Sequence, residues 1–256
     1  MIKFENTEVL GWEHAIRGMR NPMNSWDKSD SNTSFPLELR LYPDIGPNDY
    51  DLMKRLRESG TDHRKFMRML TVYVDITAPL YWWKEFDTYK VGTVANSCST
   101  MHKIADKEFT IDDFSHEHII NVMDEEIPFY CDAPAVYDNV EIMNVIIGAL
   151  NSARAIYNFY DQKLQNDMDE VDRQRIVAQK KKIWWQMIQL LPSSYNQKRT
   201  VMLNYEVLAN IYKSRKNHKQ DEWSIGFMDW IKSLPYSELI TGEFDRRFIQ
   251  NDYDKE

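Results

Sequence analysis

The stretch from Lys182 to Trp223, KIWWQMIQLLPSSYNQKRTVMLNYEVLANIYKSRKNHKQDEW, restricts the fold more than any other part of the chain. It opens with an apolar helical segment that Pro192 ends, because proline lacks an N–H group and clashes with the preceding turn. After a short polar connector, apolar residues recur at intervals of three and four, which predicts a second helix with one side in the core. The residues of that side are Met202, Leu203, Val207, Leu208, Ile211 and Tyr212.

The opposite side of this second helix is polar. Its side chains can all donate or accept hydrogen bonds, so they predict either the wall of a binding site or a solvated helix face. They are Asn204, Asn210, Arg215, His218, Gln220 and Glu222.

Periodicity elsewhere predicts a mixture of strands and helices. Apolar and polar residues alternate from Leu70 to Thr77, which is typical of a half-buried strand, and residues 2–10 predict an edge strand. Pro79 favours the start of a buried helix. Other helices are expected at Trp12–Met19, after a cap at Asn48-Asp49, and at Val136–Leu164, the last with one apolar side made of Ile142, Val145, Ile146, Leu150 and Ile156.

The segments between these elements are polar. Residues 24–34 are rich in turn formers and predict a loop, and residues 165–179 predict a charged surface segment. Residues 91–101 are small and polar, a composition that lets a ligand approach the backbone closely. Because the 256 residues contain no repeat and no clear linker, we expect one α+β domain over residues 1–256, with helices around a modest sheet and a helix-rich C-terminal half.

Composition excludes several classes of protein. The net charge of −8 argues against binding to nucleic acid, whose phosphates favour a basic surface. The longest apolar runs are too short to span a bilayer, so no membrane partner is expected. Two cysteines, Cys98 and Cys131, and the lack of a signal-peptide pattern favour a reducing, cytoplasmic setting.

Common catalytic and metal motifs are missing. His116-Glu117-His118 are adjacent, so on a helix they would point in different directions, and we expect no metal site. Cys98 has no histidine placed beside it by the sequence, which favours a passive thiol. Arg215 suits the recognition of a phosphate or carboxylate, although a surface ion pair is the alternative.

The C-terminal stretch resembles the flavin-dependent thymidylate synthases. That family has a Leu-Pro pair followed at fixed distances by a tyrosine, two asparagines, an arginine and a closing His-Ala-Gln-x-Glu. The matching residues here are Leu191-Pro192, Tyr195, Asn204, Asn210, Arg215 and His218-Lys219-Gln220-Asp221-Glu222.

The N-terminal half is similar in layout to the same family. Gly60 to His63, the strand Leu70–Thr77 and Pro79 follow in the family's order, and Asn96 and Ser99 fit its Asn-x-x-Ser signature. The match covers about residues 60–101 and 182–223. The family's Arg-His-Arg triplet reads Thr88-Tyr89-Lys90 or Tyr89-Lys90-Val91 here, its final signature arginine is Met101, Ser97 replaces its glutamate, and Ile188 replaces the arginine before Leu-Pro.

The resemblance implies the family's thymidylate-synthase-complementing-protein-like fold and a homotetramer. It also implies methylation of deoxyuridine monophosphate (dUMP) with methylenetetrahydrofolate and reduced FAD, with NADPH as reductant. The nucleotide would be bound by Arg215, Ser99, Lys90 and Asn96, and the flavin by Asn204, Asn210, His218 and His63, with no protein nucleophile. The alternatives are a diverged nucleotide-binding or interaction protein without thymidylate synthesis, and a structural protein that assembles subunits.

Overall fold

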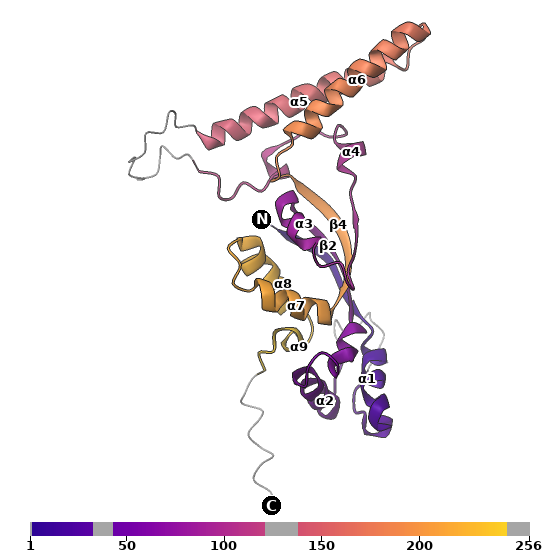
Figure 1. The fold of residues 1–256 in the computed structure, drawn as a ribbon, viewed down its shortest axis with the longest axis vertical. Helices are drawn as coiled ribbons and strands as arrows, with labels where there is room; N and C mark the ends of the chain where they lie inside the picture. Colours follow the sequence, from indigo (N-terminus) through magenta and orange to yellow (C-terminus); the bar gives the residue numbers. More distant parts are fainter. Residues whose placement is uncertain (1, 33–42, 121–137, 245–256) are drawn as a thin grey trace, which may run out of the picture. The chain divides into compact units, whose positions relative to one another are not determined.

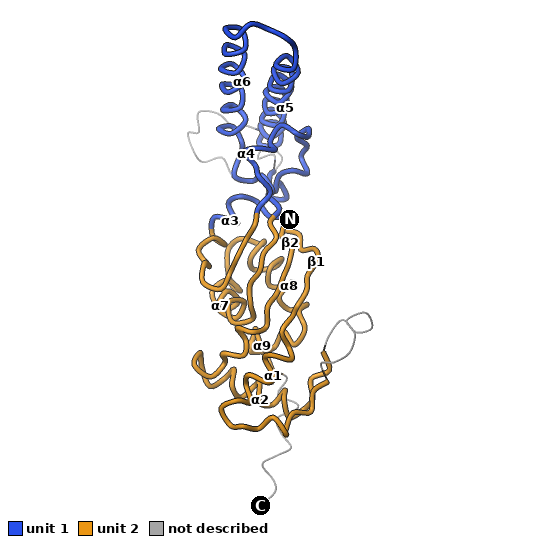
Figure 2. The backbone as a smooth tube through the Cα atoms, turned by 90° about the vertical axis from the view of Figure 1, so that its right-hand side faces the viewer, with its two compact units in different colours: residues 1, 77–84, 97–198 blue, residues 2–76, 85–96, 199–256 orange. Residues whose placement is uncertain are grey.

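The computed structural model describes residues 2–32, 43–120 and 138–244. These residues form two compact units, each made of segments that are far apart in the sequence (Figure 2). Unit 1 holds residues 77–84 and 97–198, and unit 2 holds residues 2–76, 85–96 and 199–256. Among the described residues, no helix is long and apolar enough to cross a membrane.

The architecture is mixed helix and sheet, as the sequence predicts (Figure 1). A four-stranded sheet has the order β1-β2-β4-β3, so β1 lies at one edge, in agreement with the expected edge strand. The strands are β1 (Lys3–Leu10), β2 (Thr71–Pro79), β3 (Val94–Ser97) and β4 (Asn196–Asn204). In β2, Val72, Val74 and Ile76 are buried, which confirms the alternating pattern.

The helices of unit 2 surround an aromatic core. Trp223, Phe227, Phe86 and Trp230 form a chain of ring contacts with centroid separations of 5.2–6.4 Å. Such pairs stabilise the core beyond the effect of apolar burial. The helical elements lying wholly in this unit are α1 (Trp12–Arg20), η1 (Asn21–Met23), η2 (Trp26–Lys28), α2 (Pro47–Glu58), η3 (Arg64–Arg68), α7 (Tyr205–Arg215), the π-helix η6 (Glu222–Phe227), α8 (Met228–Lys232) and α9 (Glu238–Thr241).

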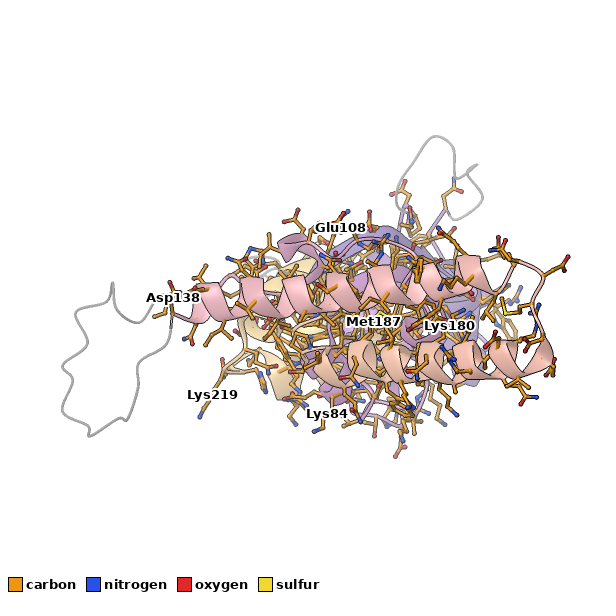
Figure 3. All side chains as sticks on the ribbon, turned by 90° about the horizontal axis from the view of Figure 1, so that it is seen from above. Lys84, Glu108, Asp138, Lys180, Met187 and Lys219 are labelled. Carbon is orange, nitrogen blue, oxygen red and sulfur yellow. The ribbon has the colours of Figure 1, made fainter. Side chains whose placement is uncertain are left out.

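Unit 1 is dominated by an antiparallel pair of long helices, α5 (Asn139–Lys163) and α6 (Glu170–Leu190). Figure 3 shows the two helices side by side, with Met187 between them. Met187 and Leu150 are fully buried in a cluster that also contains Phe109 and Phe114. Unit 1 also holds α4 (Thr100–Lys103), η4 (Ile111–Asp113) and the first five residues of α3 (Leu80–Phe86).

Of the two helices predicted in Lys182–Trp223, the first is confirmed by α6, which ends at Leu190, whereas the predicted start of the second is wrong. Residues 196–204 form strand β4, in which Val201 and Leu203 are buried and Thr200 is exposed. Because Leu203 lies four residues before Val207, which itself lies four residues before Ile211, the end of the strand also fits the helical spacing of α7. Asn204 therefore stands at the junction of strand and helix.

The expected cap at Asn48-Asp49 is also wrong. Helix α2 begins at Pro47 after Gly46, and its cap comes from another segment: the Asp30 carboxylate accepts from the backbone N–H groups of Asn48 at 2.9 Å and Asp49 at 3.1 Å. Asp49 is fully buried instead, and its Oδ1 accepts a hydrogen bond from Arg20 Nε at 2.6 Å. Its Oδ2 accepts hydrogen bonds from the hydroxyls of Ser29 and Ser31, so this carboxylate fixes the loop that precedes it.

Candidate functional site

The described residues contain two places where predicted site residues gather, one in each unit. The first, here called the Arg215 cluster, consists of Glu85, Tyr89, Arg215, His218 and Trp223, all in unit 2. The last turn of α3 supplies Glu85, the C-terminal end of α7 supplies Arg215, and η6 supplies Trp223. Such π-helical turns occur often at functional sites.

Arg215 is held on three sides. Its Nη1 donates to Glu85 Oε2 at 2.5 Å, and its Nε donates to the Tyr89 hydroxyl at 2.9 Å. The guanidinium carbon lies 5.1 Å from the centre of the Trp223 ring, within the range of a cation–π contact. Because a carboxylate contacts it directly, Arg215 offers little net positive charge to an anionic ligand.

His218 lies against the same carboxylate. Its Nδ1 accepts a hydrogen bond from the backbone N–H of Gln220 at 3.2 Å, and its Nε2 lies 3.3 Å from Glu85 Oε2. A ring nitrogen that accepts carries no proton, so in this arrangement Nδ1 is the unprotonated nitrogen and Nε2 faces the Glu85 carboxylate. Glu85 Oε2 therefore lies within 4 Å of side-chain nitrogens from two predicted site residues, Arg215 and His218.

Asn204 has a structural role at the start of α7. Its Oδ1 accepts from the backbone N–H of Val207 at 3.0 Å and caps the helix. Gly92 approaches this cap with φ +76°, and a Cβ there would lie 3.1 Å from both Asn204 Nδ2 and Val207 Cγ2. A glycine is required at this position both for its backbone conformation and for its close packing.

A second charged pair lies next to the polar side of α7. Arg64 Nε is 2.8 Å from Glu206 Oε2, and Arg64 Nη2 donates to Glu206 Oε1 at 3.1 Å, a two-point contact that holds both side chains. Asn210 Oδ1 lies 3.5 Å from the same Arg64 Nη2, at the limit of a hydrogen bond. The polar side of α7 is thus largely occupied by contacts within unit 2.

The second place is a cavity of about 480 Å³ in unit 1, here called the Ser99 cavity. It is lined by part of β2, by the start of β4 and by the segment that follows β3 around α4 and η4. The lining residues are Thr77, Cys98, Ser99, Thr100, Lys103, Asp106, Lys107, Asp112, Asp113, Tyr195, Asn196, Gln197 and Lys198.

The Ser99 cavity combines hydroxyl, amide and charged groups. Three lysines and three aspartates line it, and the ion pairs Lys103–Asp106 and Lys107–Asp113 join four of them. Both paired lysines are exposed, which leaves their ammonium groups able to reorient.

Two atoms in the Ser99 cavity are suited to a polar ligand. Asn196 Oδ1 is buried, and no group among the described residues donates a hydrogen bond to it. A buried acceptor in that state costs free energy until a donor reaches it. Burial, together with the nearby Asp113 carboxylate, raises the pKa of Tyr195, so its phenol stays protonated over a wider pH range.

The remaining predicted residues are dispersed. Ser99 lines the cavity and also caps α4 by accepting from the backbone N–H of His102 at 3.2 Å. Lys90, Asn96 and His63 are exposed and belong neither to the Arg215 cluster nor to the residues that line the cavity.

Sequence reasoning missed Glu85, Arg64 and Glu206 as partners of the predicted site residues. Glu85 is the only acidic residue in the aromatic segment from Pro79 to Phe86, which is a weak signal for a specific contact. Glu206 lies two residues after Asn204, but its burial follows only from the fold.

Comparison with known proteins identifies the fold. No protein-family model and no curated protein matches the chain. Among solved structures, Thymidylate Synthase X (ThyX) from Helicobacter pylori with FAD and dUMP matches with a TM-score of 0.57 and 13% identity over 93% of this chain and 96% of that one. Another structure of the flavin-dependent enzyme ThyX from Helicobacter pylori, also complexed with FAD and dUMP, matches with a TM-score of 0.55 and 13% identity over 92% and 96%. The chain therefore has the fold of the flavin-dependent thymidylate synthases.

Proposed function

We propose that this chain binds a nucleotide of the dUMP type in the Ser99 cavity. The observation that carries the proposal is a cavity of about 480 Å³ that holds Ser99 together with an unsatisfied amide oxygen and flexible lysines. This volume lies within the usual range for small-molecule sites.

The chemistry of the lining suits both ends of such a nucleotide. The hydroxyls of Ser99 and Thr100 and the ammonium groups of Lys103 and Lys107 can donate to phosphate oxygens. Asn196 Oδ1 can accept from the imide N–H of a uracil base, a group that an apolar ligand lacks. The mixture of donors and one buried acceptor favours a ligand with an anionic part and a hydrogen-bonding base.

The Arg215 cluster does not fit the diphosphate of FAD. Arg215 is neutralised by Glu85, Asn204 Oδ1 is used as a helix cap, and the two nitrogens of His218 face Gln220 and Glu85. Two of the residues expected to hold flavin, Asn204 and His218, are therefore engaged within unit 2, and Arg215, expected to bind the nucleotide, is paired with Glu85. For this reason we favour a diverged protein that binds a nucleotide without a flavin.

Thymidylate synthesis is the second candidate. The observation in its favour is that the likeness to ThyX extends over 93% of the chain. It would require FAD, with methylenetetrahydrofolate and NADPH as co-substrates, and the homotetrameric assembly of the family. Arg215 would then have to exchange Glu85 for the nucleotide.

A thermal-shift titration tests the first proposal. Saturating dUMP should raise the melting temperature, because a ligand that binds only the folded state adds about 2.7 kcal/mol at 100 times its dissociation constant. Ser99→Ala should reduce this shift, whereas Ser97→Ala, at a nearby exposed serine that does not line the cavity, should leave it unchanged. If dUMP produces no shift in the unaltered protein, nucleotide binding is wrong.

A separate experiment decides between the two candidates. Purified protein is examined for a flavin absorbance band and for transfer of labelled carbon from methylenetetrahydrofolate to dUMP in the presence of reduced FAD. We expect dUMP binding without flavin absorbance and without transfer. Turnover that depends on FAD would replace the first candidate with the second.

A further inference from the structure

A cavity of about 250 Å³ lies in unit 2, between one face of α1 and the segment around η2, and is here called the Trp26 cavity. None of its described lining residues is among those expected to bind nucleotide or flavin. An apolar cavity of about 150 Å³ is enough to hold benzene, so the Trp26 cavity suits a ligand with a single ring.

Helix α1 supplies a wall that is apolar in one part and charged in another. Glu13, Ile16, Arg17 and Arg20 follow one another at intervals of three, one and three residues, which places them on one helix face. Ile16 is buried, whereas the side chains of Glu13 and Arg17 are 67% and 61% exposed. This wall can therefore contact an apolar group and a charged group of the same ligand.

Trp26 gives the cavity an aromatic surface. The residue is 51% exposed, yet its ring is held in place, because its Nε1 donates to Asn21 Oδ1 at 2.8 Å. An indole that is already anchored by its polar atom can stack on a planar ring without first losing side-chain freedom.

Arg20 offers the cavity a hydrogen-bond donor. Its side chain is 4% exposed, its Nε donates to Asp49 Oδ1 at 2.6 Å, and its Nη1 donates to the Ser25 carbonyl at 3.1 Å. Among the described residues, no group accepts a hydrogen bond from Nη2. The hydroxyls of Ser29 and Ser31 also hold Asp49, so the guanidinium is fixed. A ligand acceptor can bond to Nη2 without displacing a contact within unit 2.

Arg17 supplies a positive charge that can turn toward a ligand. Its Nη1 lies 3.8 Å from Glu13 Oε1, and its Nη2 lies 3.2 Å from His14 Nδ1. Exposed contacts of this kind contribute little stability. Because Asp49 already compensates Arg20, and Glu13 would repel a second negative charge, the lining favours one carboxylate over a doubly charged phosphate.

We propose that the Trp26 cavity binds a monocyclic aromatic carboxylate, with its ring against Trp26 and Ile16 and its carboxylate at Arg17 and Arg20. The indole selects a planar ring, the volume limits the ligand to about one ring, and the two arginines select an acid. This inference does not depend on nucleotide binding in the Ser99 cavity, whose lining residues all lie in unit 1.

Fluorine NMR of para-fluorobenzoate, titrated with the full chain, measures the binding. Two competitors then separate the contributions of charge and ring. Benzamide keeps the ring without the charge and should bind about 10-fold more weakly than benzoate, because it loses a charge-assisted hydrogen bond. Cyclohexanecarboxylate keeps the charge without the aromatic ring and should bind roughly 3–10-fold more weakly.

A charge variant locates the carboxylate. Arg17→Gln should weaken benzoate binding about 10-fold and leave benzamide binding nearly unchanged. Arg55→Gln is the matched control, because Arg55 is also an exposed arginine paired with an acid four residues before it on a helix of unit 2. Arg20 is left unaltered, since its loss would leave Asp49 buried without its partner.

A ring variant locates the aromatic group. Trp26→Leu should weaken benzoate and benzamide alike, by roughly 3–10-fold. Trp185→Leu, at an exposed tryptophan of α6, should change neither. The proposal is overturned by any of three results: no saturable binding of para-fluorobenzoate, equal affinities for benzoate and benzamide, or effects of Arg17→Gln and Trp26→Leu no larger than those of their controls.

Discussion

Two arginine–carboxylate pairs in unit 2 have the same chemistry and opposite surroundings. Arg20 and Asp49 are 4% and 0% exposed, whereas Arg215 and Glu85 are 19% and 33% exposed. The Asp49 carboxylate accepts further hydrogen bonds from Ser29 and Ser31, including the backbone N–H of Ser31. Glu85 instead shares its contact with His218 beside two aromatic rings.

The difference separates a structural pair from one that a ligand could reorganise. A buried carboxylate surrounded by donors cannot lose its arginine without leaving an uncompensated charge. A partly exposed pair loses much less, because water can replace either partner. Burial, and not the identity of the charged residues, therefore decides which arginine holds the fold together.

The largest expected effect comes from breaking the buried pair. Asp49→Ala should destabilise the protein by about 3–5 kcal/mol, because Arg20 is left charged and buried. The free energy of unfolding in urea measures this loss. Asp51→Ala is the control, since Asp51 forms an exposed pair with Arg55 and should change stability by less than about 1 kcal/mol. Equal effects at the two positions would contradict the distinction by burial.

The two pairs also show which features could be predicted from the sequence and which could not. Periodicity within a few residues was sufficient for α1, β2 and most of α5, because neighbouring residues share one environment. Residues 136–137 of the predicted helix lie outside the described residues. It failed at β4, where two periods overlap near Met202 and Leu203. It could not pair Arg215 with Glu85, which are 130 residues apart, or distinguish the buried from the exposed residues on the predicted apolar side of α5. The fold class followed from local patterns and family resemblance, whereas the state of each charge required the three-dimensional structure.

A smaller loss of unfolding free energy is expected when Asp49 is protonated at low pH. Burial acts to raise its pKa, but hydrogen bonds from Ser31, Ser29 and Arg20 outweigh burial, so the pKa is lowered. A carboxylate with a lowered folded-state pKa contributes stability above its unfolded pKa of about 3.9 and loses it as pH falls through the folded value. Unfolding free energies measured from about pH 6 to pH 2.5 should therefore decline more steeply in the parent protein than in Asp49→Ala. Parallel pH profiles would show that Asp49 does not carry this dependence.

The exposed pair should change ligand preference more than stability. Glu85→Gln should cost about 0.5–1 kcal/mol, because a partly exposed ion pair contributes little. It should also leave Arg215 free to attract anions, so inorganic phosphate should stabilise this variant more than the parent protein. The double variant Glu85→Gln/Arg215→Gln controls for phosphate binding elsewhere and should lose the added stabilisation. A phosphate response that survives in the double variant would rule out Arg215 as its source.

A similarly small loss of stability is expected when the Tyr89 hydroxyl is removed. Tyr89→Phe removes the acceptor for Arg215 Nε but keeps the ring 5.7 Å from the guanidinium carbon. Because the loss of a partly solvated hydrogen bond is small, stability should fall by about 0.5–1 kcal/mol in urea unfolding. Tyr73→Phe, at an exposed tyrosine of β2, should be nearly neutral. If Tyr89→Phe instead costs as much as Asp49→Ala, then the Arg215 cluster is a rigid structural element, and exchange of Glu85 for a nucleotide at Arg215 would be too costly.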